Sequence, residues 1–398
     1  MTKMATANDT DRNLPAGWRW VQLGQFILET RNGFGRRPQV DEEGPVVLRL
    51  ADVSNGVVDL SSARRDFMSE DEINTYRLQC GDLLFVRVNG SPDFIGKCIL
   101  VESDYGVVCF NDHLIRVRVK AELLPEYLSL VSRAPAARSH FVQSSSTSAG
   151  QLTINRDSLD SFVFPLPPLS EQRRIAGMLR EKMVTAERAR AAVQAQLEAT
   201  MALPVAFARE TLRTGQTRKY LLGDCLTKIR TGIGADWSKY PVLGATRNGL
   251  APAKEGVGKA PERYKLVDPV TVFYNPMRIL LGSIAMVDEE NTTGITSPDY
   301  VVVKGRPGIL NTRWFYYWFR STHGAHLIDS LSRGAVRERI LFNRLAAGEI
   351  ELPDYETQLR VSGRMKQVRP VVEIITKELQ TIDALPSAIL REVFAGAA

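Results

Sequence analysis

The chain has 398 residues, of which 44% are hydrophobic and 24% charged, and this composition indicates a soluble globular protein of two or three domains. Its formal net charge of +6 and its pI near 9.1 permit nucleic-acid binding without requiring it. The four cysteines lack CxxC spacing and a histidine partner at zinc spacing, which argues against disulfides and a zinc site. No apolar run reaches the length of about 20 residues that a membrane span needs. We therefore expect a cytoplasmic protein.

Residues 1–13 are polar and lack the apolar core of a signal peptide, and we predict that they form a loose tail. Residues 14–168 are predicted to form a first α/β domain. Its strands are expected at 46–60 (on both sides of an Asn-Gly turn), 83–88, 95–101 and 114–119, with a helix at 124–133 and a Ser- and Gly-rich loop at 143–151.

A proline-rich stretch then leads into a long helix. Pro165, Pro167 and Pro168 cannot continue a helix and favour extended backbone before them. Residues 171–203, in contrast, contain no proline and consist mainly of strong helix formers such as Ala, Glu, Arg, Gln, Met and Leu. We therefore predict a first long helix over 169–216.

The second half of the chain repeats the first. Asn275 and Gly282 match Asn89 and Gly96 at a constant offset of 186 residues. Residues 217–353 are therefore predicted to form a second α/β domain related to the first by pseudo-symmetry. Its strands are expected at 270–274, 281–287 and 300–303, with a helix at 312–320 and a loop at 330–335.

The long helix is repeated as well, because Leu166-Pro167 and Gln172 match Leu352-Pro353 and Gln358 at the same offset. We predict a second long helix over 354–398, whose apolar residues follow a heptad pattern. The residues expected to line a seam between the helices are Ile175, Leu179, Ala186, Val193, Val361, Met365, Val368, Val372, Ile375, Leu379 and Ile382.

Because the first helix must run from domain to domain and the second must return, the two helices are expected to form an antiparallel coiled coil. The predicted fold class is therefore α+β, with two pseudo-symmetric α/β domains joined by two long helices. The alternative is a pair of ordinary amphipathic helices that pack on separate cores.

Catalytic motifs are missing from the sequence. The segments Asn275-Pro276-Met277-Arg278 and Ser297-Pro298-Asp299-Tyr300 are similar to the loop that holds the target nitrogen in amino-methyltransferases. Both lack its second proline, and neither half has a FxGxG cofactor loop, so a turn at a strand end is favoured. There is also no P-loop and no Ser/His/Asp or Cys/His constellation. We expect a binding protein without catalytic residues or a metal.

Polar and basic residues gather in the predicted loops of both halves. Arg and Asn can contact base edges bidentately, and Lys and Arg neutralise phosphates. The DNA-binding candidates are Arg31, Asn32, Arg36, Arg37, Arg87, Asn89 and Ser91 in the first half, and Arg230, Arg247, Asn248, Lys254, Lys259, Arg263, Arg278, Arg333, Arg337 and Arg339 in the second. For each residue the alternative is an ordinary solvated surface.

Several longer segments carry a family resemblance. They are LPAGW at 14–18, LGQF at 23–26, FPLPPLSEQRRI at 164–175, ALPVAFARE at 202–210, and the second-half copies ELPDYETQLRV and ALPSAILRE. With these segments, the chain from Leu14 to Phe394 resembles the specificity subunits of type I restriction–modification systems. The second helix start, LPDYETQ, departs from the pattern because it lacks the second proline and the Glu-Gln pair.

The resemblance implies two target-recognition domains that each read half of a split double-stranded DNA site, and helices that dock two methyltransferase subunits and, in some systems, restriction or motor subunits. S-adenosylmethionine, ATP and magnesium are then expected on the partner subunits, with no cofactor in this chain. The implied role is host defence and DNA methylation. The family shows no fixed DNA-reading residues, so none is carried over.

Other functions stay open at this point. The chain could serve a related modification system that lacks type I restriction, or it could be a coiled-coil scaffold that binds only protein. A stand-alone methyltransferase or nuclease is opposed by the missing motifs.

Overall fold

The computed structural model describes residues 14–36, 41–54, 56–148, 150–332 and 339–395, so the predicted tail at 1–13 lies outside the described residues. The chain divides into two compact units, residues 1–192 with 379–398 and residues 193–378. Each unit contains an α/β domain and parts of two long helices. We call the α/β part of the first unit domain 1 and that of the second unit domain 2.

Domain 1 is built on an antiparallel sheet with the strand order β2 (Ile27–Asn32), β9 (Leu114–Val119), β5 (Leu83–Val86) and β7 (Cys98–Leu100). Successive side chains of a strand point to opposite faces. Phe85 thus shares a core with residues of α2 (Pro125–Val131) and α3 (Pro135–Gln143), whereas Leu84 shares another core with residues of β3 (Val46–Leu48) and β8 (Val108–Phe110). The sheet is therefore covered on both faces.

The other elements of domain 1 close its ends and edges. They are β1 (Arg19–Gln22), η1 (Leu23–Gln25), η2 (Leu50–Val53), β4 (Arg64–Arg65), α1 (Glu70–Tyr76), β6 (Val88–Asn89), β10 (Ser146–Ser148), β11 (Gln151–Thr153), α4 (Arg156–Asp160) and β12 (Val163–Leu166). β1 pairs with β12 in a two-stranded sheet.

Two predictions in domain 1 were wrong, one of them only in part. The segment 143–151, expected as a loop, contributes to a hairpin of β10 and β11 that pairs with β6. Among the described residues of the region 46–60, only Val46–Leu48 form a strand, so the expectation is correct for its first part and wrong for its second. The chain turns into the 3₁₀ helix η2 because the buried Asp52 carboxylate accepts hydrogen bonds from the backbone and guanidinium of Arg49. Asn55 lies outside the described residues.

Domain 2 has a sheet with the same order, β14 (Leu226–Ile229), β21 (Val301–Gly305), β18 (Thr271–Tyr274) and β19 (Ile284–Val287). Tyr274 packs towards the aromatic helix α7 (Thr312–Phe319), and Phe273 packs towards β15 (Leu243–Thr246) and β17 (Lys265–Val267). The pseudo-symmetry expected from the repeat is therefore present in the strand order and in the way both faces are covered.

The remaining elements of domain 2 are β13 (Thr217–Leu221), α6 (Leu222–Cys225), η3 (Gly234–Lys239), β16 (Gly249–Pro252), η4 (Pro261–Arg263), η5 (Ile279–Leu281), β20 (Gly294–Thr296), α8 (Thr322–Ser332), α9 (Phe342–Ala346) and β22 (Glu349–Pro353). The helix α8 includes the start of the segment 330–335 that was expected to be a loop, and the rest of that segment lies outside the described residues.

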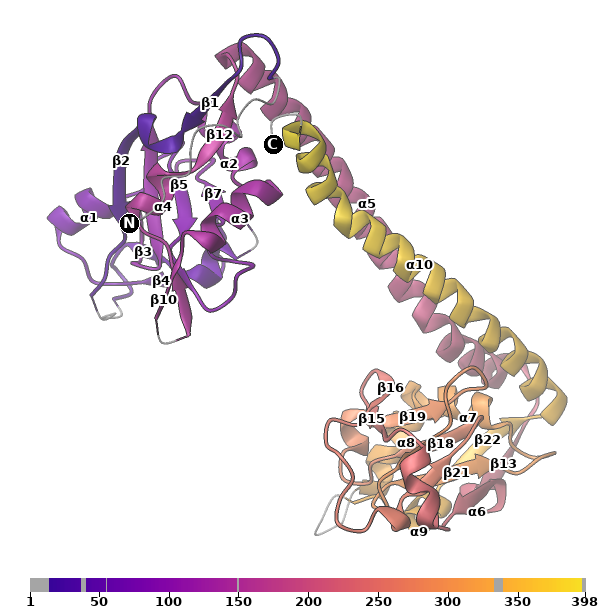
Figure 1. Cartoon of the computed structure of the whole chain (residues 1–398). Helices are drawn as coiled ribbons and strands as arrows, with labels where there is room; N and C mark the ends of the chain where they lie inside the picture. Colours follow the sequence, from indigo (N-terminus) through magenta and orange to yellow (C-terminus); the bar gives the residue numbers. More distant parts are fainter. Residues whose placement is uncertain (1–13, 37–40, 55, 149, 333–338, 396–398) are drawn as a thin grey trace. The chain divides into compact units, whose positions relative to one another are not determined.

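The two long helices are α5 (Leu169–Thr214) and α10 (Tyr355–Ala395). In the first unit, Ile175 and Leu179 near the start of α5 share a core with Leu390 and Phe394 at the end of α10. In the second unit, Ala208 near the end of α5 shares a core with residues at the start of α10. The two helices are therefore antiparallel, and the predicted fold class is confirmed (Figure 1).

The seam positions lie inside the protein to different degrees. Eight of them are buried, namely Ile175, Leu179, Ala186, Val193, Val361, Met365, Val368 and Ile375, and Val372, Leu379 and Ile382 are half-buried. Ile175 and Val361 belong to domain cores as well. At their ends, then, the helices pack on the domains and not only on each other.

Ion pairs attach domain 2 to α10. The buried Arg313 of α7 binds the carboxylate of Asp288 and donates to the Oγ of Ser362 at 3.2 Å. Lys366 of α10 pairs with Glu289, the residue next to Asp288. Burial alone would raise the pKa of Asp288, but the hydrogen bond and charge of Arg313 lower it below its ordinary value.

Candidate nucleic-acid interface

A groove of about 1560 Å³ opens in domain 2, and we call it the domain-2 groove. Its walls come from the β15–β16 hairpin, the loop that follows β18, the segment 297–300 and the helix α8. The hairpin tip is fixed by local hydrogen bonds, because the Oγ1 of Thr246 accepts from the backbone of Asn248 and donates to the carbonyl of Gly249. The groove is thus walled by a hairpin, two loops and a helix of domain 2.

The groove brings together residues that are far apart in the sequence. The predicted candidates Arg247, Lys254, Arg278 and Arg339 all line it. The first three are exposed and have no ion-pair partner among the residues that the structure describes. Five cationic side chains and only two carboxylates line the groove, so its field is positive and favours an anionic ligand.

The fifth cation, Arg320, was missed by the sequence reasoning. Its guanidinium donates to the carbonyl of Ile284 at 2.8 Å and to the carbonyl of Arg247 at 2.6 Å, so it holds the hairpin tip in place. Arg320 directly follows α7, in a segment that was expected to be helix. The role of Arg320 in holding the hairpin depends on contacts with Ile284 and Arg247, which lie far away in the sequence.

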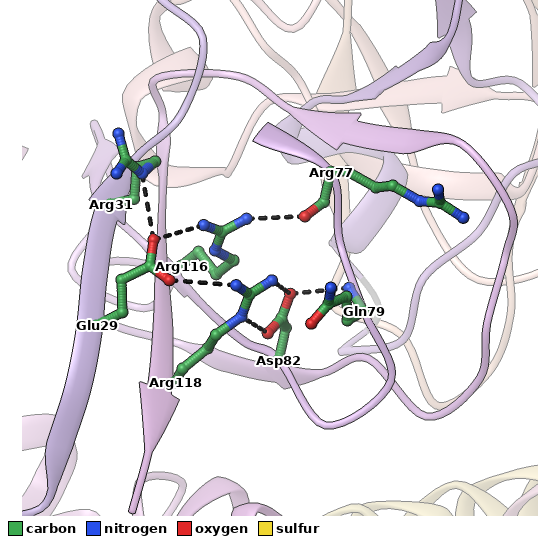
Figure 2. Close-up of polar contacts among 7 residues, drawn as sticks. All are labelled: Glu29, Arg31, Arg77, Gln79, Asp82, Arg116 and Arg118. Atoms are coloured by element: carbon green, nitrogen blue, oxygen red, sulfur yellow. Dashed lines mark hydrogen bonds and ion pairs between the residues drawn. The ribbon is translucent and has the colours of Figure 1, made fainter. Parts of the chain in front are cut away.

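In domain 1, the candidate Arg31 lies at the edge of a network of arginines and carboxylates (Figure 2). The Glu29 carboxylate accepts from Arg31 at 3.2 Å, from Arg116 at 2.7 Å and from Arg118 at 3.1 Å. Arg118 also binds Asp82, with an Nε–Oδ1 distance of 2.6 Å. Burial alone would raise the pKa of Glu29, but Arg116, with Arg31 and Arg118, lowers it below its ordinary value.

The network joins β2 and β9 to the start of β5, and the carboxylates of Glu29 and Asp82 offset part of the charge of the three guanidinium groups that bind them. Arg116 and Asp82 are buried, whereas the side chain of Arg31 is 45% exposed and the guanidinium of Arg77 points away from the carboxylates (Figure 2). Domain 2 keeps one part of it, the pair of Lys304 and Asp268 at 2.8 Å, at the offset of 186 residues. The network holds the sheet together and leaves positive charge at its edge.

Other candidates of domain 1 make contacts within the chain. Arg36 donates to the carbonyl of Phe67 at 2.8 Å and pairs with Glu72 at 3.6 Å. Arg87 is partly buried and donates to the carbonyl of Asp112 at 2.8 Å. These guanidinium groups position loops through contacts that the sequence does not reveal.

Asn89 and Ser91 cap a turn, since the Asn89 Oδ1 accepts from the Ser91 backbone at 2.9 Å and the Ser91 Oγ accepts from the Asp93 backbone at 3.2 Å. The candidates Asn32, Arg230, Asn248, Lys259 and Arg263 are exposed or partly exposed and lie outside the lining of the domain-2 groove. Arg37, Arg333 and Arg337 lie outside the described residues.

The two domains share one strand order, and each is joined to parts of the two long helices. Comparison with known proteins shows which family part of the chain is similar to. Residues 59–186 match the family described as type I restriction modification DNA specificity domain. This segment is therefore similar to the DNA specificity domain of type I restriction–modification systems.

The individual relatives agree with the family match. The chain is 34% identical over 168 residues to the type I restriction enzyme EcoKI specificity subunit of Escherichia coli K12, which covers 42% of this chain and 36% of the relative. It is 33% identical over 172 residues to the StySPI specificity subunit of Salmonella potsdam, which covers 43% of this chain and 37% of the relative. The matched segment thus spans little more than a third of either relative.

The fold is similar over nearly the whole chain. A chain from a solved structure of a type I restriction–modification system, 18% identical, superposes with a TM-score of 0.65 and covers 96% of this chain and 98% of its own length. The similarity to this structure supports the two-domain fold.

Proposed function

We propose that this chain is the DNA-reading subunit of a type I restriction–modification complex, in which each domain recognises one half of a split site. The observation that carries the proposal is the domain-2 groove, where Arg247, Lys254 and Arg278 converge without an ion-pair partner in the described part of the chain. Such cations match the phosphates and base edges of duplex DNA. The EcoKI and StySPI relatives are specificity subunits by name, which supports this assignment.

The chemistry is proposed to reside on other subunits, because the chain offers few reactive groups. Within the described ranges, no group of His, Cys, Asp and Glu could hold a metal ion. Burial raises the pKa of Cys98, and it raises the pKa of Cys109 and of Cys225 to about 11, so none of these thiols is an activated nucleophile. S-adenosylmethionine, ATP and magnesium are assigned to two methyltransferase subunits and to restriction or motor subunits.

The complex is proposed to act on DNA in the cytoplasm. No described helix is long and apolar enough to cross a membrane. The long helices α5 and α10 are proposed as the docking surface for the methyltransferase subunits, because each carries many exposed side chains between the domain ends.

The test is to express the chain with its methyltransferase partner in a host without other modification systems and to map methylated bases by sequencing. The expected result is one split motif with an unread spacer, and no methylation when either protein is expressed alone. Methylation by the chain alone would contradict the non-catalytic role. A chain that binds its partner but no DNA at low salt would instead be a protein-only scaffold.

A further inference from the structure

The loop that follows β18 in domain 2 and the loop that follows β6 in domain 1 begin and end in the same way, and we call these shared ends the loop frame. At the start of each loop an asparagine side chain accepts a hydrogen bond from the backbone two residues on. The distance is 3.0 Å from Met277 to Asn275 and 2.9 Å from Ser91 to Asn89. The last residues, Gly282 and Gly96, have φ angles of 80° and 66°, which other residues rarely adopt.

The exposed side chains between these ends differ in size and charge. Domain 1 exposes Pro92, Asp93 and Phe94, whereas domain 2 exposes Met277, Arg278, Leu280 and Leu281. The frame therefore presents different chemistry from the same position in the two domains. This arrangement is what two readers of different half-sites require.

The exposed apolar side chains of the domain-2 loop are unusual. Met277 is 63% exposed and Leu281 is 71% exposed, and both line the domain-2 groove together with Leu280 and Leu341. We call these four residues the apolar rim. Exposed apolar side chains that line one groove are typical of a binding surface.

The apolar rim lies among cations. Arg247 and Arg278 line the same groove, and the guanidinium of Arg339 donates to the Sδ of Met277 at 3.4 Å. A ligand for this surface must combine anionic groups with small apolar groups. Duplex DNA meets both requirements, because phosphates flank the major groove and thymine places its 5-methyl group there.

We propose that the apolar rim of domain 2, chiefly Met277 and Leu281, contacts thymine 5-methyl groups in the half-site that this domain reads. The inference rests on the proposed function and adds to it the base and the chemical group that are recognised. It requires at least one A·T pair in the half-site of domain 2.

The experiment uses the full chain assembled with its methyltransferase partner. Exchange of residues 217–352 for those of a relative first identifies the half-site that domain 2 reads. Each thymine of this half-site is then replaced by deoxyuridine, which lacks only the methyl group, and the Kd is measured at constant salt. For the unmodified protein we expect the Kd to rise about fourfold at one position or more, the effect of one buried methyl group.

Met277→Ala and Leu281→Ala should bind the thymine duplex more weakly and lose the sensitivity to deoxyuridine. Met277→Gln, which keeps the length of the side chain, should act in the same way. The matched control is Leu221→Ala, because Leu221 is an exposed leucine of β13 that is absent from the groove lining. This control should keep both the affinity and the sensitivity.

Equal binding of thymine and deoxyuridine duplexes by the unmodified protein would overturn the inference. Full sensitivity in both alanine variants, or a half-site of domain 2 without an A·T pair, would also overturn it. Site-specific methylation would persist in all of these cases and would leave the proposed function standing. Loss of all sequence-specific methylation in the unmodified complex would defeat the proposed function itself.

Discussion

Gln172 and Gln358 make the same three hydrogen bonds in the two halves of the chain. The Oε1 of Gln172 accepts from the backbone of Leu124 at 2.8 Å, and its Nε2 donates to the carbonyls of Glu122 and Pro167 at 3.0 and 2.9 Å. Gln358 repeats these bonds with the backbone of Asn311, Ile309 and Pro353 at 2.8, 3.0 and 2.9 Å. Both glutamines are almost completely buried, and each ties the first turn of a long helix to its own domain.

Replacing either glutamine by leucine should therefore loosen one domain only. Gln172→Leu leaves the amide of Leu124 and two carbonyls without partners, which should cost about 2–3 kcal/mol of local stability. Hydrogen exchange is the measurement: the Leu124 amide should exchange faster while the Asn311 amide stays unchanged, and Gln358→Leu should give the reverse pattern. Gln196→Leu, at an exposed position of α5, is the control. Equal effects of Gln172→Leu at both amides would contradict the prediction.

Acid should destabilise domain 2 through the carboxylates beside Arg313. The hydrogen bond from Lys366 and the charge of Arg313 lower the pKa of Glu289, as Arg313 does for Asp288. Glu289 and Asp288 therefore bind fewer protons in the folded state than in the unfolded state. Their contribution to the free energy of unfolding is complete above the ordinary pKa values of 4.5 for Glu and 3.8 for Asp. It is lost as the pH falls through the lowered pKa values of the folded state. Urea unfolding measures how the free energy of unfolding changes between pH 3 and pH 6, a range that extends about one pH unit below and above the ordinary pKa values.

Asp288→Asn should remove part of this pH dependence and cost about 3 kcal/mol at neutral pH, because Arg313 stays buried with less compensation. The control is Glu349→Gln, which removes an exposed carboxylate of β22. An unchanged acid slope in Asp288→Asn would show that other groups control the acid sensitivity.

The cations of the domain-2 groove should contribute to the salt dependence of DNA binding. Arg278→Ala and Lys254→Ala should each weaken binding and reduce the slope of log K against log salt by about 1, because one phosphate contact is lost. Titrations at several salt concentrations give the slope. Lys239→Ala should leave the slope unchanged, since Lys239 pairs with Asp236 at 2.6 Å and does not line the groove. If Arg278→Ala and Lys254→Ala both kept the salt slope of the unmodified protein, as the control should, the groove would not be part of the DNA interface.

Lengthening both long helices by about one turn should lengthen the unread spacer of the target. Four residues inserted after Gln194 and four after Thr376 add about 6 Å to each helix. The expected spacer is longer by one or two base pairs, with unchanged half-sites, and methylation mapping in cells reads it directly. Because each added base pair also rotates one half-site by about 34–36°, the gain is limited to a few base pairs. An active variant with the original spacer would show that the helices do not set the distance.

The sequence predicted the repeat, both long helices and the helices α2 and α7 well, because these depend on periodicity and on residue types that act locally. It did not predict α1, α3 or α8, or the β10–β11 hairpin. In the hairpin, pairing with β6 overrides the Ser- and Gly-rich composition that suggested a loop. The secondary structure of the short elements therefore depends on contacts with distant parts of the chain.

In the candidate interface, too, the sequence indicated the residue types but not the contacts between distant segments. Residue type alone indicated Arg247, Lys254 and Arg278, but their convergence in one groove depends on how three loops meet on the sheet. Arg87 has the same residue type, yet its guanidinium is partly buried against the Asp112 carbonyl, 25 residues away. Arg320 supports the hairpin through two backbone carbonyls. Such contacts between distant segments carry no local sequence signal.

The loop frame formed by Asn275 and Gly282 also affects how the protein can evolve. The loop is held at its ends by Asn275 and Gly282 and in its middle by the buried Ile279, whereas Met277, Arg278 and Leu281 are exposed and contribute little to the core. Substitutions at exposed positions usually change stability by less than about 0.5 kcal/mol. Mutations can therefore accumulate at these three positions while the domain stays folded, and a new contact surface can be selected without a second, compensating change in the core.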